Sequence, residues 1–258
     1  MSNIWFFGDS FATVKNFHYP DLDDNCMPNW VWMQQVARNL NVKGAGFRGL
    51  PGVSNEWIMH EVRKNSNQMQ PTDYIVIVST HINRRWFIKE KPQYSNIYLD
   101  NINDLVSKKE AKAIKMYKET FLDQHLVLST LYQEQFIAWC YNFAQVKNLR
   151  LCLIPAFDET PFYLHVEHYT DPNIINCLVG VDEREFVGKA DKKYNLLKNV
   201  WAGSDRRLCH MSEHNHTVLA QKVVRFFKYN EKLDFQNGFH QDLFKDKQDL
   251  IDYRPRDV

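Results

Sequence analysis

The chain has 258 residues, of which 44% are hydrophobic and 14% aromatic, so it can bury a sizeable core as one α/β domain and is not a disordered protein. Its 32 Lys and Arg residues balance 31 Asp and Glu residues, and the formal charge of +1 gives no overall field that favours nucleic acid or an anionic membrane. No apolar run approaches the ~18 residues that cross a bilayer, and the first residues lack the pattern of a secretory signal peptide.

The five cysteines are scattered along the chain without the Cys-x-x-Cys spacing of a zinc site or the pattern of a disulfide framework. Cys140, Cys152 and Cys177 fall inside apolar runs, which favours buried, reduced thiols. We therefore expect a reducing compartment, such as the cytoplasm, and no metal site built on cysteine.

The first predicted element is a strand formed by the apolar run Ile4–Phe7, which ends in Gly8-Asp9-Ser10. A short apolar run bounded by glycine is typical of a buried strand in a parallel sheet, and ligands of such sheets bind beyond the carboxyl ends of strands. Ser10 is therefore expected in the functional crevice, where Gly8 permits a sharp turn and Asp9 can hydrogen-bond nearby backbone. The tripeptide alone fits an ordinary helix-capping turn equally well.

Three further elements are expected before residue 70. Apolar residues recur at spacings of three and four over 30–40, which predicts an amphipathic helix. A short strand is expected over 42–47, although the glycines there weaken it. The breaker cluster 49–52 then leads to Ser54, a good N-cap for a helix that runs to about Asn65. Backbone N–H groups at such a turn suit an anion or an oxyanion.

The clearest strand is Tyr74–Val78, a continuous β-branched run with a polar loop, 79–85, at its carboxyl end. Residues 108–148 are expected to form two helices, and 150–155 another buried strand. The second helix carries an apolar stripe that predicts its core face: Leu128, Tyr132, Phe136, Trp139, Cys140 and Phe143. This order of strands and helices predicts a three-layer α/β/α sandwich with a mostly parallel, doubly wound sheet.

The last third of the chain is less regular. A short strand is possible over 173–181, and a final helix is expected after Ser212, its predicted N-cap. The buried face of that helix is predicted to contain Val218, Leu219, Val223, Phe226 and Phe227. We expect one domain over residues 1–229, with a helical insertion around 86–148, and a C-terminal arm over 230–258.

Four segments bear on function. Gly8-Asp9-Ser10, Gly52-Val53-Ser54-Asn55 and Thr80–Arg85 follow predicted strands, and Asp205–His210 immediately precedes the final helix. Over about residues 4–228 this arrangement resembles the SGNH/GDSL hydrolase superfamily, whose blocks centre on a Gly-Asp-Ser serine, a glycine, an asparagine after a central strand, and a late histidine. The resemblance implies the SGNH-hydrolase fold, which is flavodoxin-like in outline. The chain most resembles a divergent, bacteriophage-type member of the superfamily. We therefore expect the protein either in the cytoplasm or associated with a virion.

The resemblance implies that Ser10 is the nucleophile and His210 the general base that takes its proton. The backbone N–H groups of Ser10 and Gly52 would bind the oxyanion. By register His81 stands where the family has its oxyanion asparagine, and Asn83 offers the same chemistry two residues later.

The acid of the triad is left open by the sequence. The family usually has Asp three residues before the histidine, whereas this chain has Arg207, so Asp205 is the nearest acid. Either Asp205 orients His210 or a Ser-His dyad operates. Metal binding by His210, His214 and His216 is disfavoured, because residues two apart do not share a helix face.

The expected function is that of a serine esterase that removes a small, acetyl-like acyl group, on a carbohydrate, through an acyl-Ser10 intermediate. No cofactor is expected, the partner is a small-molecule or glycan ester, and the residues assigned to substrate binding are Asp9, Asn55, Thr80 and Arg84. Arg84, Arg85 and Trp86 suit an acidic or sugar ligand, and fit a solvated loop equally well.

Two alternatives remain open. The first is a catalytically inactive relative that serves as a carbohydrate-binding or virion structural module. The second is a flavodoxin-like or nucleotide-binding domain, which is disfavoured because the loop after the first strand has a single glycine rather than a phosphate-binding glycine cluster.

Overall fold

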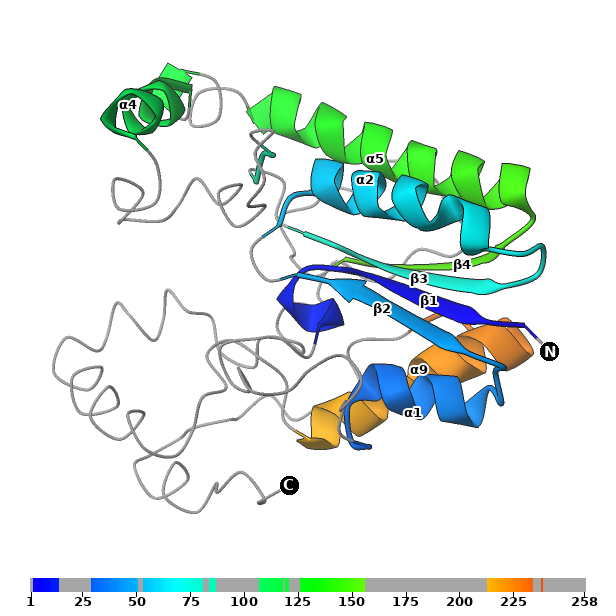
Figure 1. Ribbon diagram of the computed structural model, residues 1–258. Helices are drawn as coiled ribbons and strands as arrows, with labels where there is room; N and C mark the ends of the chain where they lie inside the picture. Colours follow the sequence, from blue (N-terminus) through cyan, green and yellow to red (C-terminus); the bar gives the residue numbers. More distant parts are fainter. Residues whose placement is uncertain are drawn as a thin grey trace, which may run out of the picture.

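The computed structural model contains a parallel β-sheet with helices packed on both of its faces (Figure 1). It describes residues 2–13, 29–50, 53–80, 84–86, 107–117, 119–120, 126–155, 213–233 and 238. Within this part of the chain four parallel strands lie in the order β2-β1-β3-β4: β1 (Ile4–Gly8), β2 (Ala45–Gly49), β3 (Tyr74–Ser79) and β4 (Arg150–Pro155). The strands predicted over 4–7, 74–78 and 150–155 are confirmed.

The strand expected over 42–47 begins later, at Ala45. The preceding residues complete the end of the first helix, because Asn41 adopts a φ of 51° and the N–H of Val42 donates to the carbonyl oxygen of Ala37. Gly46 is part of the strand, and the reason that this position is a glycine is the side chain of Trp5 that packs over it. A Cβ there would lie 2.4 Å from the Trp5 ring, so only glycine leaves room for that indole on the neighbouring strand.

Two helical layers enclose the sheet (Figure 1). One face is covered by α1 (Trp32–Asn39) and α9 (Glu213–Tyr229), and the other by α2 (Asn55–Asn65) and α5 (Leu126–Lys147). The predicted fold class, a three-layer α/β/α sandwich with a parallel doubly wound sheet, is therefore confirmed. The remaining labelled elements are α4 (Lys108–Tyr117) and the short 3-10 turns η1 (Ser10–Ala12) and η2 (Ser66–Gln68).

Each face of the sheet has its own apolar core, and β1 contributes to both. Ile4 and Phe6 belong to the core with α1 and α9, whereas Trp5 and Phe7 belong to the core with α2 and α5. Successive side chains of a strand point to opposite faces, so a central strand that is covered on both faces must be apolar throughout. This is why residues 4–7 form an unbroken apolar run.

The predicted core face of α5 is partly wrong. Tyr132 is 40% exposed, and Trp139 and Phe143 are only partly buried and stack on each other, with ring centroids 5.2 Å apart. Among the side chains of α5 that the structure describes, those of Gln133, Phe136, Ile137, Cys140 and Ala144 are buried, and the side chain of Leu128 lies outside that set. Apolar residues occur on every side of this helix, so its sequence does not single out the face that packs on the sheet.

The buried side chains of α9 include four of the five predicted ones, and Val218 is partly buried. Cys140 and Cys152 are buried and reduced, as predicted, and burial raises the pKa of both thiols. Cys177, the possible strand over 173–181 and most of the arm over 230–258 lie outside the described residues.

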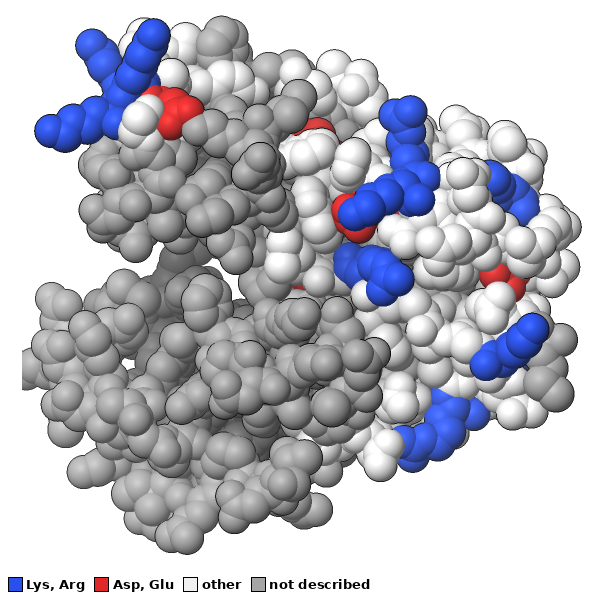
Figure 2. Space-filling model, in the orientation of Figure 1, with Lys and Arg blue, Asp and Glu red and all other residues white. Residues whose placement is uncertain are grey.

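Charge is dispersed over the face of the molecule that Figure 2 shows. On the face shown in Figure 2, Lys and Arg side chains are spread widely, with one group over α4, at the upper left. The exposed lysines of that helix are Lys108, Lys109, Lys112 and Lys115. Among the described helices, none combines the length and the apolar character needed to cross a membrane.

Candidate active site

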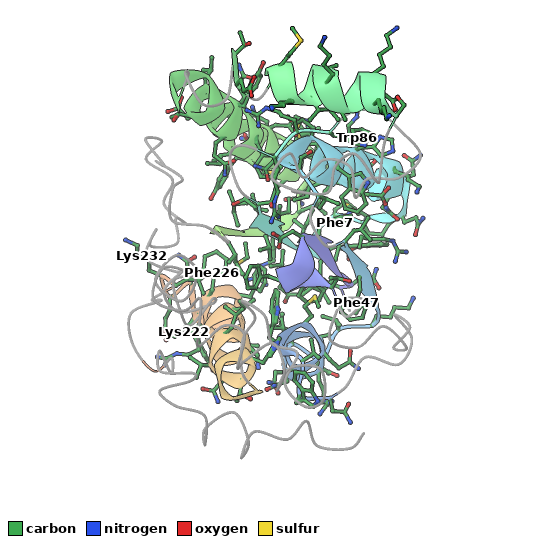
Figure 3. The ribbon with its side chains drawn as sticks, turned by 90° about the vertical axis from the view of Figure 1, so that its left-hand side faces the viewer. Phe7, Phe47, Trp86, Lys222, Phe226 and Lys232 are labelled. Atoms are coloured by element: carbon green, nitrogen blue, oxygen red, sulfur yellow. The ribbon has the colours of Figure 1, made fainter. Side chains whose placement is uncertain are left out.

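The carboxyl ends of β1 and β3 meet where the winding of the chain reverses. From β1 the chain passes through α1 to β2 at one side, and then through α2 to β3 on the other side of β1. Ligands of open α/β sheets bind at such a reversal, outside the carboxyl ends of the strands. Figure 3 views the molecule from this edge, with Phe7 of β1 between the two helical layers. Asp9 and Thr80 follow the two strands at this point.

Asp9 is the centre of a buried polar cluster. Its carboxylate is fully buried, and Oδ1 accepts a hydrogen bond of 3.1 Å from the backbone N–H of Phe11, which caps η1. Oδ2 accepts from the Thr80 hydroxyl at 3.1 Å and from Nη1 of Arg84 at 2.9 Å. A buried carboxylate is tolerated only when it is paired and hydrogen-bonded, and Asp9 meets both conditions.

Ser10 is the first residue of η1, and the backbone around it is closely packed. A Cβ on Gly8 would lie 2.8 Å from the Cβ of Ala12 and 2.9 Å from the carbonyl oxygen of Val78. A Cβ on Gly49 would lie 2.0 Å from the carbonyl oxygen of Ala12. The glycines therefore let η1 rest directly on the ends of β2 and β3, which fixes the path of the backbone that carries Ser10.

Residues 84–86, which follow β3, contact both α2 and α5. The Arg85 guanidinium lies 4.5 Å from the centre of the Tyr132 ring, and its Nε is 3.8 Å from Oε1 of Glu56. The Trp86 ring lies 4.9 Å from the ring of His60 and packs on the same core as α2 (Figure 3). Side chains that are 14% exposed at Arg84 and 10% at Arg85 are not those of a solvated loop, so that interpretation is wrong.

Asn55 joins α2 to the end of β3 through its side-chain amide. Its Oδ1 accepts from the backbone N–H of Thr80 at 3.0 Å, and its Nδ2 lies 3.5 Å from the carbonyl oxygen of the same residue. The same Nδ2 donates to Oε1 of Gln133 at 2.5 Å. Gln133 was missed in the sequence, because α5 also contains Gln135 and Gln145 and no local pattern distinguishes the glutamine that is buried.

The structure thus brings together four predicted residues, Asp9, Asn55, Thr80 and Arg84, beside the backbone of Ser10. Their assignment to substrate binding stays a prediction. Five other predicted site residues lie outside the described residues: Gly52, His81, Asn83, Asp205 and His210.

His216 has a structural partner. Its Nδ1 accepts from the backbone N–H of Trp32 at the start of α1, at 3.3 Å, and its ring lies 5.2 Å from that of Trp30. Among the described residues, no group of three His, Cys, Asp or Glu side chains could hold a metal ion.

Comparison with known proteins gave no match to a protein-family model and none to a curated protein. Among solved structures, the chain is similar to the crystal structure of a member of the lipolytic protein G-D-S-L family from Veillonella parvula DSM 2008. The identity is 10%, the TM-score is 0.38, and the alignment covers 90% of this chain and 100% of that chain.

Proposed function

We propose that this protein is a serine esterase that removes a small acyl group, of the size of acetyl, from a carbohydrate ester. The Ser10 oxygen attacks the acyl carbonyl carbon while His210 takes the hydroxyl proton. The bond to the alcohol oxygen breaks, and the alcohol leaves with that proton. Water, deprotonated by His210, then adds to the acyl carbon, and the bond to the Ser10 oxygen breaks as His210 returns that proton to it. The acid product gives its own proton to solvent and leaves as the carboxylate.

The observation that carries this proposal is the position of Gly8-Asp9-Ser10. Ser10 begins the turn at the carboxyl end of the central strand, where the chain's winding reverses, and the preceding carboxylate is fully buried and bound by three donors. A nucleophile must be presented in one geometry, and a backbone fixed on both sides supplies it. An ordinary surface turn does not need a buried ion pair of this kind.

The other roles follow the resemblance to SGNH hydrolases. We assign the oxyanion to the backbone N–H groups of Ser10 and Gly52, with His81 or Asn83 as the third donor. Asp205 orients His210, or the ring is held by a backbone carbonyl. The carbohydrate and the acetyl-like acyl group come from the family's substrate class. Arg84 is the member of the buried cluster with the most exposed side chain, at 14%, and we assign it to contact with the substrate.

The test combines a fluorophosphonate probe with hydrolysis of p-nitrophenyl acetate. Wild type should be labelled, and both Ser10→Ala and His210→Ala should lose labelling and at least about a hundredfold of kcat/KM. Ser2→Ala, just before the start of β1 and so at the opposite end of that strand from Ser10, and His60→Ala, at an exposed position of α2, serve as matched controls and should keep wild-type values.

Two results would contradict the proposal. Hydrolysis that survives both Ser10→Ala and His210→Ala would place the chemistry elsewhere. A folded wild type that neither reacts with the probe nor hydrolyses the ester, but is retained by an acetylated polysaccharide, would instead identify a carbohydrate-binding or virion structural module.

A further inference from the structure

A chain of side-chain hydrogen bonds runs from α5 to the turn that carries Ser10. Gln133 binds Asn55, Asn55 binds the backbone of Thr80, and the Thr80 hydroxyl binds Asp9. Asp9 in turn accepts from the N–H of Phe11, inside η1. The donor–acceptor distances along this chain are 2.5, 3.0, 3.1 and 3.1 Å.

The orientation of both amides in this chain is fixed by the backbone. The Thr80 N–H can only donate, so the atom of Asn55 that faces it must be the oxygen, Oδ1. The Nδ2 of Asn55 therefore points to Gln133, whose accepting atom must be Oε1. A side chain without an acceptor at position 133 would leave the Asn55 amide free to rotate away from Thr80.

Every residue in this series of hydrogen bonds is at least nine-tenths buried. The exposed fractions are 1% for Gln133, 8% for Asn55, 1% for Thr80, 0% for Asp9 and 6% for Phe11. Hydrogen bonds are stronger in such surroundings than in water, and linked hydrogen bonds strengthen one another. The loss of one bond in a network therefore weakens its neighbours. The Nε2 of Gln133 has no hydrogen-bond partner in the part of the chain that the structure describes. Methionine would fill the same space without that unpaired donor, so what the glutamine adds is its acceptor.

We propose that Gln133 is a positioning residue for Ser10, acting from α5 through Asn55, Thr80 and Asp9 on the turn η1. This inference rests on the proposed esterase function. Gln133 does not touch the reacting atoms in this proposal. It holds Thr80 and the carboxylate before Ser10 in the single arrangement that the nucleophile needs.

The test compares wild type with Gln133→Met, Gln133→Glu and the matched control Gln135→Met, which alters an exposed glutamine two positions along the same helix. Gln133→Met keeps the length of the side chain and replaces the amide oxygen with a thioether, which is only a weak acceptor, whereas Gln133→Glu keeps an accepting oxygen in either protonation state. For each variant we would measure kcat and KM for p-nitrophenyl acetate, hydrogen exchange at the Phe11 and Thr80 amides, and stability in urea.

Gln133→Met should lower kcat by about tenfold with little change in KM, because one neutral hydrogen bond is lost from the network. Exchange at Thr80 and Phe11 should accelerate by a similar factor, while Leu40, in the turn after α1, should be unaffected. Gln133→Glu should recover most of kcat and of the protection, and Gln135→Met should match wild type in every measurement.

The proposal is overturned if Gln133→Met keeps wild-type kcat and protection, or if Gln133→Glu is as impaired as Gln133→Met. It is also overturned if the loss of kcat merely follows a loss of folded protein in urea. Failure of the esterase proposal is recognised separately, because wild type would then show no Ser10-dependent hydrolysis. In that case unchanged exchange at Phe11 in Gln133→Met would still refute the positioning chain.

Discussion

The buried pair of Asp9 and Arg84 sets the energetics of the candidate site. A carboxylate with no exposed surface is stable only because it has a cation at 2.9 Å and two further donors. Removing one member of such a pair leaves the other charge in a poorly solvated place. Removing both leaves no uncompensated charge.

This pair can be tested with a double-mutant cycle. Asp9→Asn and Arg84→Met should each lower the free energy of unfolding in urea by about 3 kcal/mol, because each leaves a buried partner behind. The double variant should lose clearly less than the sum of the two. If the two losses simply add, the ion pair does not contribute to stability in the way that its geometry indicates.

Gly49 tests the packing of the turn at Ser10. A methyl group there would lie 2.0 Å from a backbone oxygen of Ala12, and neither strand β2 nor η1 can move without disturbing the other. Gly49→Ala should therefore cost about 3 kcal/mol or more in urea unfolding, the upper range for overpacking. The control is Gly44→Ala, where the nearest atom is the side-chain oxygen of Asn3 at 3.3 Å. Equal stability of the two variants would contradict the tight contact.

At the scale of elements, α1 depends on a residue of α9 for its first turn. Val31, its N-cap residue, makes no side-chain capping bond, and the N–H of Trp32 donates instead to His216. His216→Ala should destabilise the protein by about 1 kcal/mol, the usual value of a lost cap, with the midpoint of thermal unfolding as the measurement. His216→Asn places an acceptor near the same position and should recover part of the loss. A His216→Ala variant as stable as wild type would show that the bond is dispensable.

The helices and strands also show which features could be predicted from the sequence and which could not. The strand at Tyr74–Val78 was predictable because a buried parallel strand must be apolar without interruption, and the helix from Ser54 because its N-cap is a local signal. The packed face of α5 was not predictable, since apolar side chains surround that helix. The same holds for the contacts of Gln133 and Arg84, because they depend on how elements distant in the chain are placed. Local patterns carry no such information.

At the scale of the whole molecule, a buried aspartate lies beyond each end of the central strand β1. Asp9 lies at the carboxyl ends of the strands. Asp73 lies at their amino ends, where it joins the starts of β1 and β3. Asp73 accepts from the backbone N–H groups of Asn3 at 2.8 Å and Gln70 at 3.0 Å, and from the Trp5 indole at 3.3 Å. The two carboxylates therefore have different consequences. Asp9 supports the candidate site, whereas Asp73 contributes to folding alone.

Asp73 should make the free energy of unfolding depend on pH. Burial acts to raise the pKa of Asp73, but the hydrogen bonds from Gln70, Asn3 and Trp5 outweigh it, so the pKa lies below its ordinary value of 3.8 in the folded protein. The folded state then binds the proton more weakly than the unfolded state does. The stabilisation is fully present above the unfolded pKa of about 4, and is lost as the pH falls through the folded pKa.

Asp73→Asn should thus be less stable than wild type in urea at pH 7, by about 2 kcal/mol for the lost charge-assisted bonds. The difference should shrink steadily below about pH 4 as the wild-type carboxylate takes up its proton. Glu119→Gln, which alters an exposed carboxylate beside α4, is the control and should follow wild type throughout. Ester hydrolysis at pH 7 should survive in Asp73→Asn, because the substitution lies at the edge of the sheet opposite Ser10. A stability difference that stays constant from pH 7 to pH 3 would mean that Asp73 titrates alike in both states, and that its hydrogen bonds do not favour the charged form.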